Sequence, residues 1–343
     1  MYNKKYNVIY KGMIEVNIII LPRKESFIKT FPKDSNALSI LLNYKSAYPW
    51  LMNNFIQLTS YDDYYLDFCD FWYRNCPLLE CQRIKIELIY KGYESIHDFI
   101  IEVIGQGYYI YLPILREYIS AYQANGVHDM LIFGFDKDKR RYYISDYFQG
   151  HYGDRSCSFQ ELEKAIDIGQ KEYWFNGFRG CIELLSYISE ERAKFEEWRV
   201  KESVRDYLEG KPNSRWYESH AMWTEEETKR RRFGIMCYDT IYNHLNILKE
   251  GNIRGEADAA FLLMEEHKNV MYRRLLFMKE NGYTVAPECL CFYETMSKKA
   301  REMRLMKLKY SITHDNKILG KLKSGYKGME ESERVQLRHF LDY

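Results

Sequence analysis

The stretch HDMLIFGFDKDKRRYYISDY, residues 128–147, decides the fold of this chain. Two apolar and aromatic runs of strand length, residues 128–135 and 140–147, lie on either side of the polar segment 136–139. Two such runs joined by a short polar turn are typical of an antiparallel hairpin. A third apolar run, residues 108–114, predicts a strand just upstream, so this part of the chain is expected to contain an antiparallel sheet.

The hairpin places a histidine and a carboxylate on one face of the sheet. A turn at residues 136–139 puts Asp146 or Tyr147 opposite His128. A carboxylate in that position can fix the imidazole tautomer and support a base at a nucleophilic site. A purely structural histidine–aspartate contact is the alternative interpretation.

Working outward, the first half of the chain combines helices and strands, and the second half is helical. Helix caps and apolar spacing of three to four residues indicate helices, and short apolar runs indicate strands. Strands are expected at 6–10 and 15–21, and one or two helical turns within 48–58. A helix is expected at 34–44, with Asp34 or Ser35 as its N-cap. Two more helices are expected at 95–104, capped by Ser95, and at 158–168, where Ser158 and Glu161 match a capping box.

From about residue 188 onward the pattern is helical. Residues 190–208 are expected to form a helix, and the segment 210–214 is the clearest break. Three later apolar stripes are typical of helices packed in a bundle. The predicted fold class is therefore α+β, with one domain over residues 1–188 and a helical domain over 189–343.

Composition narrows the functional classes. Fifty basic and 49 acidic residues give a net charge of +1, which disfavours general nucleic-acid binding. The early apolar run near residues 14–22 is too short and too mixed for a secretion signal or a membrane span. With eight dispersed cysteines, these features predict a cytoplasmic protein with free thiols.

A site of this kind also needs a nucleophile. The start of the helix near residue 34 is the expected place, because a helix N-terminus stabilises a thiolate and can host an oxyanion. No cysteine lies there, and Ser35 is the only hydroxyl in the first turn. Its simplest role is that of an N-cap; its alternative role is that of the nucleophile.

Four segments, residues 36–44, 128–135, 142–146 and 160–168, resemble the peptidase C39-like domains. The similarity is greatest to the acyltransferase branch typified by the N-terminal domain of butirosin biosynthesis protein H, and it covers residues 15–185. It implies a papain-like fold with an antiparallel sheet. In that family a cysteine at a helix start attacks an acyl thioester on a carrier protein, a histidine accepts its proton, and an aspartate or asparagine orients the histidine.

On this pattern His128 matches the base and Asp146 the orienting residue. The cysteine position falls between Pro32 and Ser35, where no cysteine occurs, and no glutamine precedes Gln57 to help form an oxyanion hole. Either the thiol chemistry has been lost, or Ser35 replaces it, or the sequence carries a Cys-to-Ser change.

The resemblance implies an acyltransferase or amide-bond-forming enzyme of peptide-type natural product biosynthesis. Its partners would be an acyl or peptidyl carrier protein, which supplies the phosphopantetheine arm, and a small amine or peptide acceptor, with no cofactor of its own. The alternatives are a catalytically inactive papain-like scaffold that binds a carrier protein or peptide, and a cysteine peptidase.

Two further patterns bear on partners and metals. Lys229, Arg230, Arg231 and Arg232 form a basic run at the start of a predicted helix, which is either a solvated face or a docking patch for an acidic carrier protein. The close pairs Cys76/Cys81 and Cys289/Cys291 lack a second pair at zinc spacing, so no metal site is expected.

Overall fold

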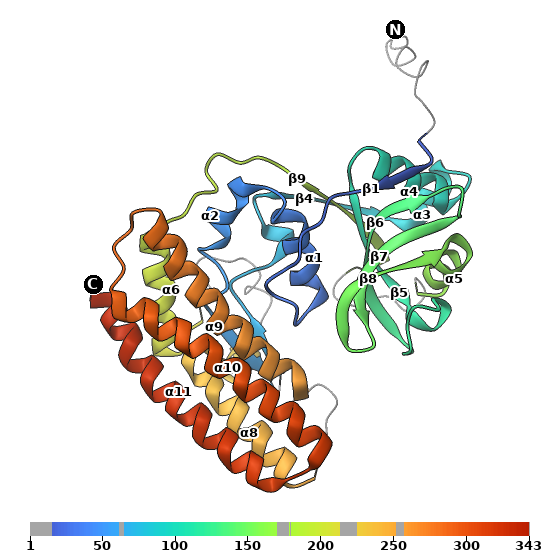
Figure 1. The fold of residues 1–343 in the computed structure, drawn as a ribbon. Helices are drawn as coiled ribbons and strands as arrows, with labels where there is room; N and C mark the ends of the chain where they lie inside the picture. Colours follow the sequence, from blue (N-terminus) through green and yellow to red (C-terminus); the bar gives the residue numbers. More distant parts are fainter. Residues whose placement is uncertain are drawn as a thin grey trace. The chain divides into compact units, whose positions relative to one another are not determined.

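The computed structural model describes residues 16–61, 65–169, 178, 180–212, 225–251 and 257–342. It is α+β, with antiparallel sheets and a helical C-terminal region. Figure 1 shows the elements, and the chain divides into two compact units. Unit 1 comprises Met1–Pro22 and Cys81–Ser186, and unit 2 comprises Arg23–Glu80 and Tyr187–Tyr343.

This division differs from a single boundary at residue 188. The crossing at 186/187 lies near the predicted position, but residues 23–80 belong with the helical region. Long-range hydrogen bonds account for this: the buried Arg274 guanidinium donates to the backbone carbonyls of Met52 and Asn54. Local sequence patterns do not indicate such contacts, because the two segments are more than 200 residues apart in the chain.

Unit 1 is built on a seven-stranded sheet. Its path runs β4-β9-β5-β6-β7-β8, and β1 pairs with β6 at the side of this path. The strands are β1 (Ile18–Ile20), β4 (Leu79–Lys85), β5 (Tyr109–Leu115), β6 (Val127–Asp136), β7 (Arg141–Phe148), β8 (His151–Ser158) and β9 (Cys181–Tyr187). The predicted strand at 15–21 is thus shorter than expected, and the one predicted at 6–10 lies outside the described residues.

Helices α3 (Ile86–Gly92), α4 (Ile96–Gly105) and α5 (Phe159–Gly169) complete unit 1. Ser95 caps α4 by accepting a hydrogen bond from the Asp98 backbone, as predicted. The predicted capping box of α5 is also confirmed: Glu161 N donates to Ser158 Oγ at 3.2 Å, and Ser158 N donates to Glu161 Oε2 at 2.6 Å.

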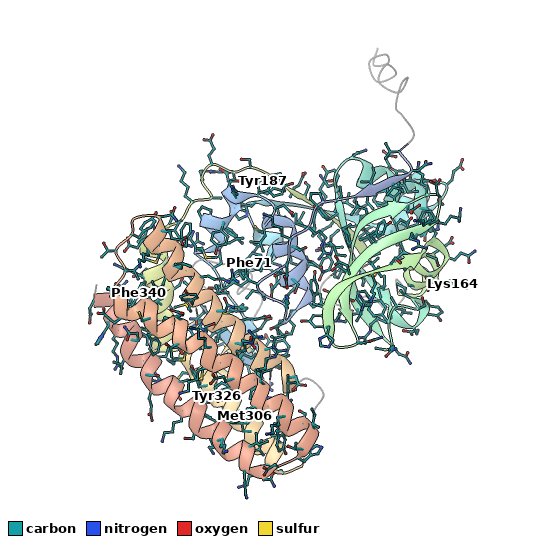
Figure 2. The ribbon with its side chains drawn as sticks, viewed as in Figure 1. Phe71, Lys164, Tyr187, Met306, Tyr326 and Phe340 are labelled. Atoms are coloured by element: carbon teal, nitrogen blue, oxygen red, sulfur yellow. The ribbon has the colours of Figure 1, made fainter. Side chains whose placement is uncertain are left out.

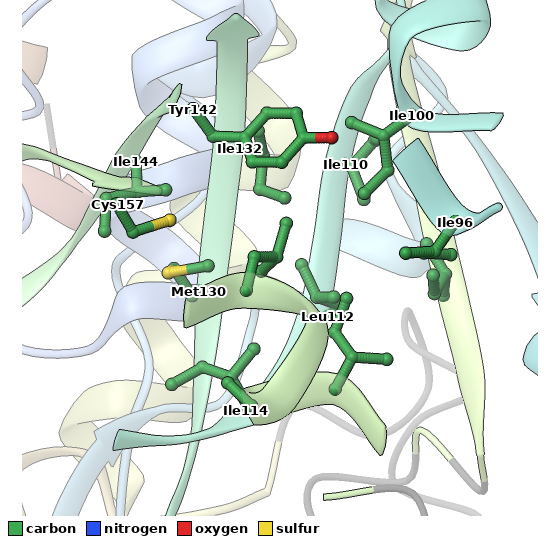
Figure 3. Packing of buried hydrophobic residues seen from close by; sticks show 14 of the residues in the cluster. Ile96, Ile100, Ile110, Leu112, Ile114, Met130, Ile132, Tyr142, Ile144 and Cys157 are labelled. Atoms are coloured by element: carbon green, nitrogen blue, oxygen red, sulfur yellow. The ribbon is translucent and has the colours of Figure 1, made fainter. Parts of the chain in front are cut away.

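The core of unit 1 combines mostly aliphatic side chains with several aromatic rings, and they come mainly from the strands and from α3, α4 and α5; Figure 3 shows part of this cluster. Ile110, Leu112 and Ile114 alternate along β5, and Met130 and Ile132 continue the layer on β6. The same sheet face carries His128, so the candidate site lies at the end of this apolar layer.

Helices dominate unit 2. They are α1 (Pro32–Leu41), α2 (Tyr48–Leu51), α6 (Glu197–Glu209), α7 (Glu225–Lys229), α8 (Tyr238–Lys249), α9 (Ala257–Glu280), α10 (Pro287–Thr313) and α11 (Asn316–Asp342). A small sheet of order β10-β2-β3 joins them, made of β2 (Leu58–Tyr61), β3 (Tyr65–Phe68) and β10 (Arg232–Phe233). The predicted helical turns within 48–58 are present only at 48–51.

The long helices α9, α10 and α11 pack along one another, with α8 and α6 against α11. Tyr326 and Phe340 of α11, labelled in Figure 2, are buried in this bundle. The predicted helix at 190–208 begins only at Glu197 and ends at Glu209. The next residue, Gly210, caps it with a φ of 64°, a left-handed conformation that glycine adopts readily.

A buried ion pair crosses the bundle from α9 to α11. Lys268 Nζ lies 2.7 Å from Glu333 Oε2, and both side chains are fully buried. The hydroxyls of Tyr207, Tyr238 and Tyr293 donate to the same carboxylate. The neighbouring His267 bonds to Ile56 O through Nε2 and faces Lys268 through Nδ1, so it is a satisfied core histidine.

Candidate functional site

The site in unit 1 centres on His128, the second residue of β6. Its Nδ1 lies 2.7 Å from Oδ2 of Asp146 on β7. The His128 side chain is 22% exposed, whereas the Asp146 side chain is fully buried. An imidazole with one nitrogen on a buried carboxylate and partial access to solvent has the geometry of an oriented base.

The two residues meet diagonally rather than face to face. The turn spans residues 137–140, one residue later than expected, and a bulge lies between the pairs Ile132–Ile144 and Gly134–Tyr143. Leu131 consequently pairs with Ser145, and the continuing register places Asp146 one diagonal step from His128 on the same face. The predicted contact is present because the shift leaves both side chains on that face.

Tyr122 is a third member of this site, from the loop between β5 and β6. Its hydroxyl donates to Asp146 Oδ2 at 2.6 Å, the same oxygen that contacts His128. Burial and the adjacent carboxylate raise the pKa of Tyr122, so the phenol stays protonated and acts as a donor. Asp146 Oδ1 is buried and has no hydrogen-bond partner among the described residues.

A second carboxylate lies beside the histidine. Asp129 Oδ1 is 4.0 Å from His128 Nδ1, and its Oδ2 accepts a hydrogen bond from Tyr111 of β5. Asp129 is 3% exposed. His128 is therefore positioned by Asp146 and Tyr122 and lies in a strongly acidic neighbourhood.

Ser35 occupies a different setting from the one predicted. Helix α1 begins at Pro32 with Phe31 as N-cap, so neither Asp34 nor Ser35 caps it. Proline suits the first helical position, and the residue before it prefers the extended conformation that Phe31 has. Ser35 is fully buried in unit 2, and its hydroxyl contacts the carbonyls of Ile28 and Phe31 at 3.0 Å each.

Most of the cysteines are buried. All eight are free, and six of them are buried: Cys69, Cys76, Cys157, Cys181, Cys237 and Cys289. Burial raises the pKa of Cys157, the buried thiol on β8, and raises that of Cys76 to about 12. Among the described residues, no cluster of three or more metal-ligating side chains is present.

The basic run lies at the end of a helix, not at the start. Lys229 is the last residue of α7 and pairs with Glu225, and Arg232 belongs to β10, where its Nε is 3.9 Å from Asp239. The guanidinium groups of Arg230 and Arg231 lie 5.3 and 4.9 Å from the Tyr61 ring centroid. The acidic residues 225–227 explain the orientation, because carboxylates favour the first turn of a helix.

Sequence reasoning missed Tyr122, Asp129 and Tyr111 as neighbours of the histidine. Asp129 follows His128 directly, so its proximity was visible in the sequence, whereas Tyr122 and Tyr111 are two of 32 tyrosines with no distinguishing pattern.

Comparison with protein-family models gives no match to this chain, and comparison with curated proteins gives none either. In the described ranges, every helix is too short or too polar to cross a membrane.

Proposed function

We propose that unit 1 catalyses the transfer of an acyl group from a carrier-bound thioester to an amine, with His128 as the base. The observation that supports this most strongly is the 2.7 Å contact between His128 Nδ1 and the buried Asp146. With the proton on Nδ1 donated to Asp146, the lone pair of a neutral imidazole lies on Nε2. That nitrogen is then the one able to take a proton.

The proposed step needs no nucleophile from the protein. The acceptor nitrogen attacks the thioester carbonyl carbon as His128 Nε2 removes its proton, and Asp146 stabilises the resulting imidazolium. The carbon–sulfur bond then breaks, and the phosphopantetheine thiolate leaves with the proton from His128. The products are an amide and a free thiol, so atoms and charge balance. This route fits the burial of Ser35 and of most cysteines. The eight free cysteines agree with the reducing cytoplasm that the sequence predicts.

A binding function without catalysis is the second candidate: an inactive scaffold for a carrier protein or peptide. The observation that favours it is that Ser35, the only hydroxyl in the first turn of α1, is buried and contacts two backbone carbonyls. The two candidates differ in one measurable outcome, which is turnover.

The experiment supplies an acyl-loaded carrier protein and an amine acceptor, and it measures amide formation by mass spectrometry. We expect His128→Ala to lower the rate by at least about 100-fold, because general-base catalysis contributes on that order. His151→Ala is the matched control, since His151 is an exposed histidine on β8 of the same unit. Equal rates for wild type and His128→Ala would overturn the catalytic proposal, and carrier binding without turnover would favour the scaffold.

We also propose that the basic run 229–232 contacts the acidic carrier protein. Reversing Arg230, Arg231 and Arg232 to glutamate should weaken carrier binding by about tenfold or more at low salt, since rim charges steer association. The control is a second triple variant in which three exposed lysines of α11 are changed to glutamate, so that the same charge change is made elsewhere: Lys317, Lys321 and Lys323. Equal affinities of the two triple variants in calorimetric titration would exclude this docking patch.

A further inference from the structure

Unit 2 contains a cavity of about 730 Å³ that lies apart from the His128 site in the sequence. Its walls come from residues 24–29, from the segment that follows α1, from α9, and from Arg304 of α10. All of the lining residues belong to unit 2. A cavity of this size matches the usual volume of small-molecule and cofactor sites.

Positive charge predominates in the cavity once the internal pairs are assigned. Lys29 pairs with Glu25, and Arg304 Nη1 lies 3.1 Å from Glu265 Oε2. The Glu266 carboxylate accepts hydrogen bonds from Lys29 N at 2.6 Å, from Thr30 N and from the Thr30 hydroxyl. The three lining carboxylates are therefore already engaged.

Three cations remain: Lys24, Lys45 and Arg273. Among the described residues, none of these three side chains has a carboxylate partner. Arg273 Nε donates to Asn269 Oδ1 at 2.7 Å, and its guanidinium carbon is 5.6 Å from the Phe27 ring centroid. These contacts orient the guanidinium, and its terminal N–H groups have no acceptor among the described residues. An oriented guanidinium fork matches two oxygens of one phosphate.

Aromatic rings form part of the wall beside these charges. Tyr44 stacks on Tyr187 with ring centroids 3.6 Å apart, and Tyr48 packs edge-on against Phe277 at 5.8 Å. Phe27 lies under Arg273. Because neighbouring rings hold Tyr44 and Tyr48, they present a preformed surface on which a flat apolar group can pack.

We propose that this cavity binds a small organic phosphate whose phosphate contacts Arg273, Lys24 and Lys45 and whose apolar or aromatic body packs on Tyr44 and Tyr48. The five cations and three carboxylates of the lining give a formal charge of +2, which matches a dianion better than a monoanion and favours a phosphate monoester over a carboxylate. The inference does not depend on the acyl-transfer proposal, because the two sites share no residue.

The test is calorimetric titration of the full chain with three probes: 1-naphthyl phosphate, 1-naphthol and inorganic phosphate. We expect 1-naphthyl phosphate to bind at least tenfold more tightly than either other probe, since each of those supplies only half of the recognised chemistry. Arg273→Glu should weaken its binding by at least tenfold. Lys279→Glu, at an exposed lysine of the same helix outside the cavity, should leave it unchanged.

Lys45→Glu serves as a second variant and should weaken binding in the same direction, with circular dichroism verifying the fold of each protein. Equal affinity in Arg273→Glu, Lys45→Glu and Lys279→Glu would overturn the proposal, as would equal affinity for 1-naphthol and 1-naphthyl phosphate. Absence of 1-naphthyl phosphate binding at millimolar concentration would overturn it as well.

Discussion

Tyr122 contributes to the His128 site through one hydroxyl group bonded to a fully buried carboxylate. Replacing it with phenylalanine keeps the ring, which packs against Phe148 at 4.8 Å, and removes only the donor to Asp146. A hydrogen bond to a charged group contributes about 1.5–3 kcal/mol, so Tyr122→Phe should lower the free energy of unfolding by that amount. Urea denaturation measures it, and Tyr118→Phe, at a partly exposed tyrosine nearby, should change stability by under about 0.5 kcal/mol. A loss for Tyr122→Phe no larger than that of the control would contradict this role.

At the scale of single residues, the sequence predicts the contact between His128 and Asp146 but not the other side chains around it. Strand alternation is insensitive to a register shift that keeps both residues on one face, so the contact between His128 and Asp146 could be predicted despite the displaced turn. Tyr122 reaches Asp146 from a loop, and no periodicity specifies where a loop side chain points. The polar residues Asp34 and Ser35 predict a cap at that position, but Pro32 favours the first helical position, so α1 begins earlier with Phe31 as its N-cap.

Gly134 explains how β1 can approach β6. A Cβ atom at this position would lie 2.5 Å from the Ile19 carbonyl oxygen and 3.0 Å from Ile20 Cα, so any side chain would push β1 away. We expect Gly134→Ala to cost about 1–3 kcal/mol of stability and to speed amide hydrogen exchange at residues 18–20. Gly153→Ala on β8 is the control, because a Cβ there meets nothing within 4 Å. Unchanged exchange at residues 18–20 in Gly134→Ala would show that the close approach does not matter.

Elements marked by side-chain caps or sharp turns were the ones that could be placed from the sequence. Helices α4 and α5 begin where Ser95 and Ser158 predict, because a capping hydroxyl satisfies backbone donors at one defined position. The start of α6 lies seven residues later than predicted. The segment 190–196 is rich in charged residues and has a helical composition, but its backbone hydrogen bonds form turns instead. Composition indicates that a helix can form, and caps determine where it begins.

The assembly of unit 2 from two separate segments could not be predicted from local pattern. Glu266 and Arg274 of α9 bond to the backbone of residues 29–30 and 52–54, and these contacts depend on which buried charges find acceptors after folding. The ion pair between Lys268 and Glu333, with the three tyrosines around it, likewise depends on which buried charged groups meet after folding. Buried charged groups must be paired or hydrogen-bonded, but the sequence does not indicate which of 99 charged residues become buried.

Two buried carboxyl groups of unit 2, those of Glu266 and Asp34, should make its free energy of unfolding fall as pH rises. Burial raises the pKa of Glu266 to about 8 and, with the nearby Asp67, raises that of Asp34 to about 7. Between the unfolded and folded pKa values, the folded protein binds more protons than the unfolded chain, so the free energy of unfolding falls as pH rises. The buried His267 and His244 have lowered pKa values and act oppositely, but only below about pH 6.5.

The informative window is therefore pH 6.5–8. If the folded protein keeps one proton over this range that the unfolded chain has lost, the free energy of unfolding falls by about 1–2 kcal/mol between pH 6.5 and 8. Urea denaturation at several pH values should show this decline for the wild type and a flatter profile for Glu266→Gln, which cannot ionise. Glu280→Gln, at an exposed glutamate of the same helix, should retain the wild-type slope. A slope as steep in Glu266→Gln as in Glu280→Gln would mean that Glu266 is already ionised in the folded protein, held as an anion by the donors of Lys29 and Thr30.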